Sequence, residues 1–306
     1  MMLSFKLKRI LLKLFSLLSV IRGYNILVVI IAQYLAAIFI FSPSKTLYNI
    51  VFDVHLFYIV FATICVIAAG YIINNFYDVP VDRINRPFKT RIDNYVRQST
   101  KLKIYFALNF IAFVFGCLIS WRAALFFSVY IFAIWLYSHK LKKYPVFGLL
   151  SAALLTISPF LAVFIYFKNI SVSIIFYAVF LFLVVLVREL LKDLQNLKGA
   201  ILNNYDTFPV IYGERKTKQL AVLLLLVTLL IIVTFTTNVT IGVMKYYFYG
   251  SFVMLFFIGI FICISSSLKH YAILHNLLKI LLLTGVIWLV LIDKTILIER
   301  VLHLFC

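Results

Sequence analysis

Apolar stretches of roughly 17 to 25 residues recur along this chain, separated by short polar or basic turns. A helix of that length crosses the hydrocarbon core of a bilayer, which is about 30 Å thick. Of the 306 residues, 65% are hydrophobic and 13% are charged, whereas soluble domains carry about half apolar and a quarter charged residues. Strand-like alternation over short segments is missing, which argues against a β-barrel. The sequence therefore predicts an all-α, polytopic membrane protein.

The apolar pattern predicts nine transmembrane helices and leaves no space for a separate soluble domain. The expected spans lie at about 23–42, 54–75, 103–120, 123–139, 147–167, 171–190, 218–236, 243–264 and 272–292. We therefore expect residues 23–306 to form one transmembrane domain.

Residues 1–22 precede the first span and place Lys6, Lys8, Arg9 and Lys13 among leucines and phenylalanines. A signal peptide would have an uninterrupted apolar part followed by a small-x-small cleavage site, and this segment has neither. We expect a cationic amphipathic helix that lies on an anionic membrane surface.

The distribution of basic residues predicts the orientation, because short cytoplasmic loops retain Lys and Arg. Of the 29 Lys and Arg, 22 fall on the side of the N-terminus, six fall on the opposite side, and Lys279 lies inside a span. We therefore expect a cytoplasmic N-terminus and an external C-terminus in a bacterial inner membrane. The net charge of +19 is explained by this topology and by anionic headgroups, so it gives no support to nucleic-acid binding.

The cysteines and histidines suggest no metal site or haem. The four cysteines lie alone without a CxxC pair, and the five histidines are scattered. We interpret them as packed or interfacial side chains.

The acidic residues are distributed unusually. Of only ten, seven fall in or beside the two longest polar breaks, which run from 78 to 101 and from 191 to 218 and lie on one side of the membrane. The seven are Asp78, Asp82, Asp93, Glu189, Asp193, Asp206 and Glu214.

Two pairs of these acidic residues are spaced four apart, Asp78 with Asp82 and Glu189 with Asp193. On a helix each pair shares a face and repels by a few tenths of a kcal/mol, unless a cation relieves the repulsion. Oxygen ligands of this kind suit Mg²⁺, which takes one or two carboxylates plus substrate phosphates.

Permanent cations stand beside each acidic pair. They are Arg83, Arg86 and Lys89 after the first pair, and Arg188, Lys192 and Lys198 around the second. Any one of them is explained by the retention of basic residues in cytoplasmic loops. The joint arrangement instead favours a clamp in which magnesium and basic side chains hold a diphosphate and neutralise the charge of a leaving group.

Two motifs resemble those of the UbiA superfamily of intramembrane prenyltransferases. The first, NDxxDxxxD in that family, reads "NNFYDVPVD" from Asn74 to Asp82 and is followed by "RINRP". The second, "RELLKDLQNLKGAILNNYDTFPVIYG" from Arg188 to Gly213, is similar to the pattern RExxKDxxDxxGD, TxP and glycine of the archaeal lipid and chlorophyll branches. It is most similar to geranylgeranylglyceryl-phosphate geranylgeranyltransferase-like members.

The resemblance implies helices around a central cavity and Mg²⁺-dependent transfer of a prenyl group from a polyprenyl diphosphate to a lipophilic acceptor. It implies that diphosphate is held through Mg²⁺ by residues of both motifs, namely Asn74, Asp78, Asp82, Glu189 and Asp193. Of these, Asp78, Asp82 and Asp193 are the expected catalytic residues. The expected substrate-binding residues are Asn74, Arg83, Arg86, Lys140, Lys142, Arg188 and Lys192.

Three positions depart from the family pattern. Asn75 replaces the first Asp of the first motif, and Asn196 and Ala200 stand where the second motif often has Asp. The second metal site is therefore expected to be weak, to use other ligands, with Asp206 a candidate, or to be lost.

These departures keep a second hypothesis open, a catalytically impaired protein that binds or transports prenyl lipids on the same scaffold. A generic transporter is disfavoured because paired spans broken by Pro or Gly are missing. The sequence does not identify the acceptor or the prenyl chain length, and it indicates no obligate protein partner.

Overall fold

The structure, a computed structural model, describes residues 5–42, 45–239 and 241–291, and within these ranges it contains helices and no strand. Nine helices in the described part are long and apolar enough to cross a membrane, which confirms the predicted number. They are Gly23–Phe41 (α2, Gly23–Ala36, continued by η1, Ala37–Phe41), α4 (Val54–Asn85), α6 (Gln98–Ile119), α7 (Trp121–His139), α8 (Pro145–Phe167), α9 (Val172–Gln195), α11 (Phe208–Asn238), α12 (Met244–Ile264) and Leu268–Leu291 (α13, Leu268–Trp288, continued by η3, Leu289–Leu291).

Short helices connect the spans or precede them. They are α1 (Phe5–Ile21), α3 (Leu47–Val51), α5 (Pro87–Asp93), η2 (Leu141–Lys143) and α10 (Leu197–Leu202). The helix expected in the N-terminal segment is therefore present as α1, and its place on the membrane surface stays a prediction. The expected position of the C-terminus lies outside the described residues.

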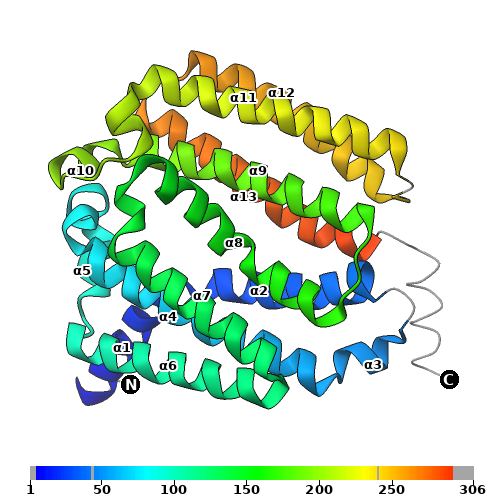
Figure 1. The fold of residues 1–306 in the computed structure, drawn as a ribbon. Coiled ribbons are helices and arrows are strands. Elements are labelled where there is room, and N and C mark those ends of the chain that lie inside the picture. The colour runs from blue at the N-terminus through cyan, green and yellow to red at the C-terminus, as the bar shows by residue number, and fades with distance from the viewer. Residues whose placement is uncertain (1–4, 43–44, 240, 292–306) are drawn as a thin grey trace.

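Six spans form a closed ring in which each helix contacts the next, in the order α2, α4, α7, α8, α9 and α13. Helix α6 packs outside the ring on α4 and α7, and α11 and α12 pack outside it on α9 and α13. Figure 1 shows these outer helices on opposite sides, with α11 and α12 at the top and α6 at the bottom. At one end, Phe41 packs on Phe160 and Phe164, with ring centroids 4.9 and 6.0 Å apart.

Local sequence explains where several helices begin. Asp53, Ser120, Ser171 and Ser267 each accept a hydrogen bond from a backbone N–H in the first turn of α4, α7, α9 and α13 respectively, as N-cap residues do. Helices α5 and α8 begin with proline, whose missing N–H costs nothing in the first turn.

Two helices extend beyond the expected C-terminal ends of their spans, and α11 begins at Phe208 instead of near residue 218. Helix α4 continues from the predicted end near residue 75 to Asn85, and α9 continues from 190 to Gln195. Both extensions are polar, so hydropathy falls while the backbone stays helical, and Pro80 is accommodated inside α4. The acidic pairs therefore lie on helices, and α4 and α9 end after the polar breaks have begun.

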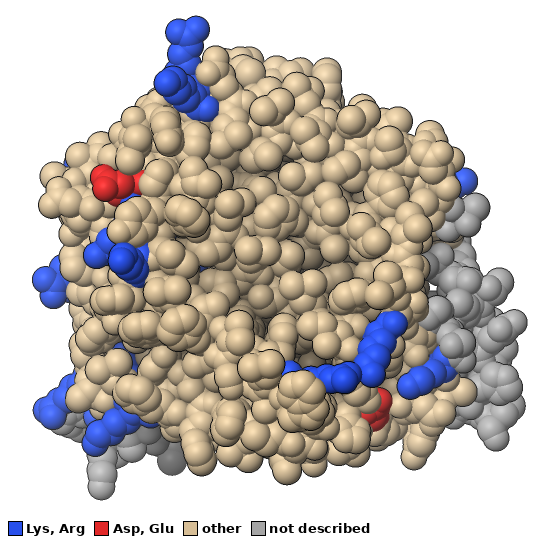
Figure 2. All heavy atoms as spheres, viewed as in Figure 1, with Lys and Arg blue, Asp and Glu red and all other residues tan. Residues whose placement is uncertain are grey.

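Charged side chains are unevenly distributed over the surface that Figure 2 shows. On the face seen in Figure 2 they gather towards the two ends of the helices, and the broad surface between is uncharged. This distribution is the one expected of a helical bundle that crosses a bilayer.

Candidate active site

The ring of six spans encloses a cavity of about 940 Å³. Its polar part is lined by the last turns of α4, by η2, by the end of α9 and by the segment from Asn196 to Thr207. Its apolar part continues between α2, α8, α9 and α13, where Phe160 and Phe180 contribute rings, and the first turns of α12 also reach it through Phe248. The cavity thus joins a charged mouth to an apolar interior.

The first motif presents one face of α4 to the cavity. Asn74, Asp78 and Asp82 all line it, and Arg86 continues the row at the end of the helix. Residues four apart fall nearly above one another on a helix, so the spacing of the motif places its three side chains on the same side of α4, facing one site.

The Asp78 carboxylate accepts a hydrogen bond and ion pair from Lys142 of η2. The pair is well shielded, since the side chains of Lys142 and Asp78 are 7% and 18% exposed. Burial lowers the pKa of the Lys142 ammonium below its ordinary value, and the Asp78 carboxylate offsets part of that effect. The ammonium also lies 5.9 Å from the ring centres of Tyr77 and Tyr205. Burial raises the pKa of the Tyr205 hydroxyl to about 12, so this hydroxyl is protonated at neutral pH.

The second motif brings four charged side chains to the same cavity from α9: Arg188, Glu189, Lys192 and Asp193. Glu189 is buried and accepts from Arg188 at 2.9 Å and from Lys192 at 2.7 Å. Because both of its oxygens already face cations, Glu189 serves to position Arg188 and Lys192 in this structure.

Three other side chains with oxygen donors are available to bind a metal ion. In the described part of the chain no ion pair or side-chain hydrogen bond involves Asn74, Asp82 or Asp193, and all three line the cavity. No group of three or more His, Cys, Asp or Glu within the described ranges is gathered closely enough to hold a metal ion. The donors therefore fit Mg²⁺ only in its usual manner, in which one or two carboxylates share the ion with substrate phosphates and water.

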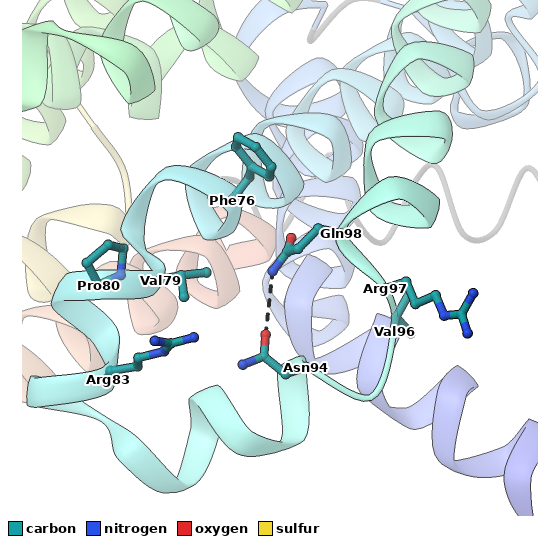
Figure 3. Close-up of a pocket in the computed structure, with 8 residues that line it drawn as sticks. All are labelled: Phe76, Val79, Pro80, Arg83, Asn94, Val96, Arg97 and Gln98. Carbon is teal, nitrogen blue, oxygen red and sulfur yellow. Dashed lines mark hydrogen bonds between the residues drawn. The ribbon is translucent and has the colours of Figure 1, made fainter.

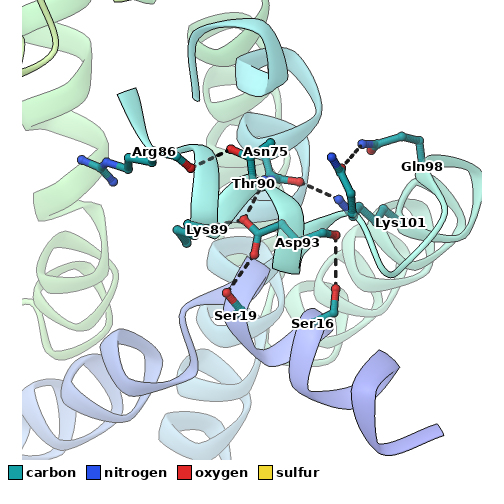
Figure 4. Close-up of polar contacts among 10 residues, drawn as sticks. Ser16, Ser19, Asn75, Arg86, Lys89, Thr90, Asp93, Gln98 and Lys101 are labelled. Atoms are coloured by element: carbon teal, nitrogen blue, oxygen red, sulfur yellow. Dashed lines mark hydrogen bonds and ion pairs between the residues drawn. The ribbon is translucent and has the colours of Figure 1, made fainter. Parts of the chain in front are cut away.

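Asn75 faces away from the cavity, into a buried polar network between α1, α4, α5 and α6 (Figure 4). Its side chain accepts from Lys101 Nζ at 2.8 Å and donates to Asp93 Oδ2 at 3.2 Å. Ser19 donates to the other Asp93 oxygen at 2.8 Å. Lys101 is 0% and Asp93 2% exposed, and a buried charge requires such partners. The departure at Asn75 thus lies outside the predicted metal ligands.

Asn196 and Ala200, in contrast, do line the cavity. Their substitution removes two carboxylates that would face it, and Asp206 does not replace them, because it is exposed and outside the cavity lining. The carboxylates of the second motif that line the cavity are those of Glu189 and Asp193.

The ends of the two motifs are tied together by Asn85. Its amide donates to the Asn196 carbonyl at 3.3 Å, and its side-chain oxygen accepts from the Gly199 N–H at 3.2 Å. A Cβ on Gly199 would lie 2.3 Å from Asn85 Nδ2, so only glycine permits this approach. The tie fixes the distance between the α4 carboxylates and the second motif.

Two expected substrate-binding residues lie elsewhere. Arg83 lines a separate surface groove with Phe76, Val79 and Pro80 (Figure 3), and Lys140 is exposed outside the cavity lining. The helical period explains Arg83, because five residues after Asp78 place it about 140° around α4.

Several cavity residues were not predicted from the sequence. They are Arg22, Tyr24, Asn25, Asn85, Tyr205, His275 and Lys279, whereas Lys89, expected as a cation beside the first acidic pair, also lines the cavity. Asn85 could have been predicted, because it follows Asp78 by seven residues and so shares its face. The others come from distant segments that only the fold brings together.

The family model described as UbiA prenyltransferase family matches residues 26–273. The digeranylgeranylglyceryl phosphate synthase of Methanosphaera stadtmanae is 29% identical over 173 residues, which cover 56% of this chain and 63% of the relative. The chain therefore aligns with about three fifths of the length of this relative.

Solved structures share the fold. A structure of a digeranylgeranylglyceryl phosphate synthase superposes with a TM-score of 0.70 at 19% identity and covers 91% of this chain and 98% of its own. A UbiA homolog from Archaeoglobus fulgidus bound to GPP and Mg²⁺ superposes with a TM-score of 0.63 at 14% identity, covering 90% and 99%. These likenesses show an intramembrane fold of the same type.

Proposed function

The chain belongs to the UbiA prenyltransferase family, and we propose that it transfers the prenyl group of a polyprenyl diphosphate, of the geranylgeranyl type, to a lipophilic acceptor with release of diphosphate. The observation that carries the proposal is the shared cavity, in which carboxylates and cations from both motifs stand at the charged mouth of an apolar interior. A diphosphate fits the mouth and a prenyl chain fits the interior.

The proposed donor site uses residues of three elements. Lys142, Arg188 and Lys192 hold phosphate oxygens and neutralise the charge that develops on the leaving diphosphate. Asn74, Asp78, Asp82 and Asp193 are the groups that would hold Mg²⁺, which supplies further positive charge to the same oxygens. Glu189 holds Arg188 and Lys192 in place, and binding of the donor competes with Asp78 for Lys142.

The proposed reaction breaks the bond between the prenyl C1 and the diphosphate oxygen, whose electron pair leaves with diphosphate. The allylic cation then forms a bond to the acceptor nucleophile, which loses its proton. Tyr71, Tyr137 and Tyr205 line the cavity, and aromatic faces of this kind stabilise a nearby cation. Closure of the cavity by packed helices keeps water from the cation.

The acceptor and the membrane orientation are also proposals. The relatives are named for a glyceryl phosphate lipid product, which supports a glyceryl ether phosphate as the acceptor. The excess of basic residues on the side of the cavity mouth supports a cytoplasmic mouth, and the bacterial inner membrane stays a prediction.

The first test is mass spectrometry of products after incubation of the membrane-embedded protein with geranylgeranyl diphosphate, Mg²⁺ and a panel of acceptors. Alkylated acceptor should form with wild type and disappear with Asp78→Ala. Asp206→Ala is the matched control, because Asp206 is exposed outside the cavity, and it should keep the activity. Full turnover by Asp78→Ala would overturn the assigned roles.

The competing function, binding of prenyl lipids without catalysis, is favoured by Asn196 and Ala200, which line the cavity without a carboxylate. It predicts that wild type binds the donor without turnover under any metal. Ala200→Asp separates the two functions, because a large gain in turnover would show that the altered second motif limits catalysis.

A further inference from the structure

The proposed transfer sets a proton free, and none of the residues assigned above takes it up. When a neutral hydroxyl attacks the allylic cation, the product is a protonated ether, which reverts to the cation unless its proton is removed. A positioned base commonly raises the rate of such a step by about 10² to 10⁴-fold. The base has to lie in the cavity, carry a free lone pair and stand near the donor C1.

Four carboxylates of the described residues line the cavity, and each has another task. Glu189 and Asp78 already accept hydrogen bonds from lysine or arginine side chains. Asp82 and Asp193 are assigned to Mg²⁺ in the proposed function, and a nearby cation disfavours protonation of a carboxylate. A base that stays free when donor and metal are bound must therefore be another side chain of the cavity.

His275 of α13 is the histidine that lines the cavity in the described part of the chain. Its Nδ1–H donates to the Arg188 carbonyl of α9 at 3.4 Å. A carbonyl oxygen can only accept a hydrogen bond, so this contact places the proton of the neutral ring on Nδ1. The lone pair of Nε2 is then unprotonated.

Nε2 of His275 is accessible from the cavity. It forms no hydrogen bond with any described residue, and it is not one of the buried polar atoms that are left unpaired in the described ranges. His270, five residues earlier on the same helix, differs on both points, because its Nδ1 is buried without a partner and the residue lies outside the cavity lining. His275 thus presents a free basic nitrogen to the cavity.

His275 lies where the charged lining of the cavity gives way to the apolar lining. On α9 the charged lining ends at Arg188, and the next lining residues toward the interior are Leu181 and Phe180. On α13 the lining changes in the same way after Lys279, one turn beyond His275. The donor C1 joins the diphosphate to the prenyl chain, so it has to lie at this transition.

Arg188 indicates where the leaving group binds. One of its terminal nitrogens donates to Glu189 at 2.9 Å, whereas its Nε–H is buried and has no hydrogen-bond partner among the described residues. An unpaired buried donor is unfavourable, and a diphosphate oxygen would satisfy it. A diphosphate held by Arg188 brings the donor C1 close to His275, which contacts the backbone of the same residue.

We propose that His275 is the base that takes the proton of the acceptor hydroxyl. The proposal rests on the prenyl transfer proposed above and adds a catalytic residue to it. A lone pair of the hydroxyl oxygen forms the bond to the prenyl C1. The O–H bond then breaks, its electron pair stays on the ether oxygen, and the proton passes to Nε2. The imidazolium gives this proton to the released diphosphate, which leaves through the charged mouth.

His275→Asn separates a base from a structural residue. The amide nitrogen of asparagine can donate to the Arg188 carbonyl as Nδ1 does, but asparagine has no basic lone pair. The variant should unfold at the wild-type temperature, bind geranylgeranyl diphosphate as tightly as wild type and form alkylated acceptor at least about 100-fold more slowly. The matched control is His270→Asn, on the same helix and outside the cavity lining, which should alkylate the acceptor at the wild-type rate.

Positional isotope exchange measures ionisation of the donor separately from its capture. Geranylgeranyl diphosphate with an oxygen isotope in the bridging position is incubated with Mg²⁺, a geranylgeranyl glyceryl ether phosphate and the protein in nanodiscs. Reversible cleavage of the bond between C1 and oxygen moves the label to non-bridging positions. His275→Asn should exchange the label at least as fast as wild type does and yet form little alkylated acceptor.

The outcomes separate this inference from the proposed function. Alkylation by His275→Asn at the wild-type rate would overturn the assignment of the base and leave the prenyl transfer standing. Loss of isotope exchange together with alkylation would also overturn it, because His275 would then act on the donor. If His275→Asn unfolds at a lower temperature, His275→Gln is judged by the same two measurements. Wild type that forms no alkylated acceptor would refute the prenyl transfer and this inference with it.

Discussion

The contact between Asn85 and Gly199 gives the sharpest test of how the two motifs are held together. In Gly199→Ala the new Cβ would lie 2.3 Å from Asn85 Nδ2, and the two next nearest atoms, at 2.7 Å, also belong to Asn85. Such an overlap forces α10 away from the end of α4 or turns the Asn85 amide out of place. Both of its hydrogen bonds, to the Asn196 carbonyl and from the Gly199 N–H, are then lost.

The expected cost follows from those two hydrogen bonds. Each contributes about 0.5 to 1.5 kcal/mol, so Asn85→Ala should destabilise the protein by roughly 1 to 3 kcal/mol, and Gly199→Ala by at least as much because the overlap is added. Since all three nearest atoms belong to Asn85, truncation of Asn85 removes the clash. The double variant should therefore be more stable than Gly199→Ala alone, with a coupling of about 1 kcal/mol or more.

The assay is thermal unfolding in nanodiscs of wild type, the two single variants and the double variant, with kcat/KM for the donor measured on the same samples. Asn203→Ala is the control, because Asn203 donates to the Gly199 carbonyl from within its own segment, whereas the hydrogen bonds of Asn85 go to other groups. Additive losses in the double variant, or a Gly199→Ala protein as stable as wild type, would refute the tie between the motifs.

Three further predictions follow from single positions. Gly213 interrupts α11 at φ 79° and ψ 166°, a conformation that is essentially confined to glycine. Gly213→Ala should therefore lower the free energy of unfolding by about 1 to 3 kcal/mol. The control Gly250→Ala, at a helical position with open space where the Cβ would lie, should not lower it. Asn75→Asp should leave the Mg²⁺ dependence of turnover unchanged, because the side chain faces Asp93 and Lys101, and a tighter metal response would contradict this placement. Burial lowers the pKa of Lys142, so kcat/KM for the donor should fall in the alkaline range at a lower pH than an ordinary lysine would give. In Lys142→Arg this alkaline fall in the pH profile should move to higher pH. An alkaline fall at the same pH in both proteins would assign the titration to another group.

Much of the fold could be predicted because the thickness of a bilayer determines the length of each apolar segment that crosses it. All nine spans are present. The observed helix ends differ from the expected ones where a polar segment remains helical, as in the extension of α4 from residue 75 to Asn85. Hydropathy reports where a segment leaves the hydrocarbon, whereas the helix ends only where its backbone changes conformation, at Arg86.

The site could be predicted only where the motif is local. The spacing of Asn74, Asp78 and Asp82 defines a helix face, and the structure presents that face to the cavity. The same rule places Arg83 on another face. Lys279 and Arg22 line the cavity because α13 contacts α2 and closes the ring. A contact between helices so far apart in the sequence cannot be predicted from a local sequence pattern.

The central claim is that the carboxylates of both motifs act on one diphosphate. The most direct measurement is the Mg²⁺-dependent release of diphosphate together with alkylated acceptor, for wild type, Asp82→Asn, Asp193→Asn and Asp206→Asn. Asp82 and Asp193 form no ion pair in the described part of the chain, so their substitution leaves no cation unpaired. The account predicts equal amounts of the two products from wild type and Asp206→Asn, and loss of both products from Asp82→Asn and Asp193→Asn. Undiminished release from either of those two variants would contradict it.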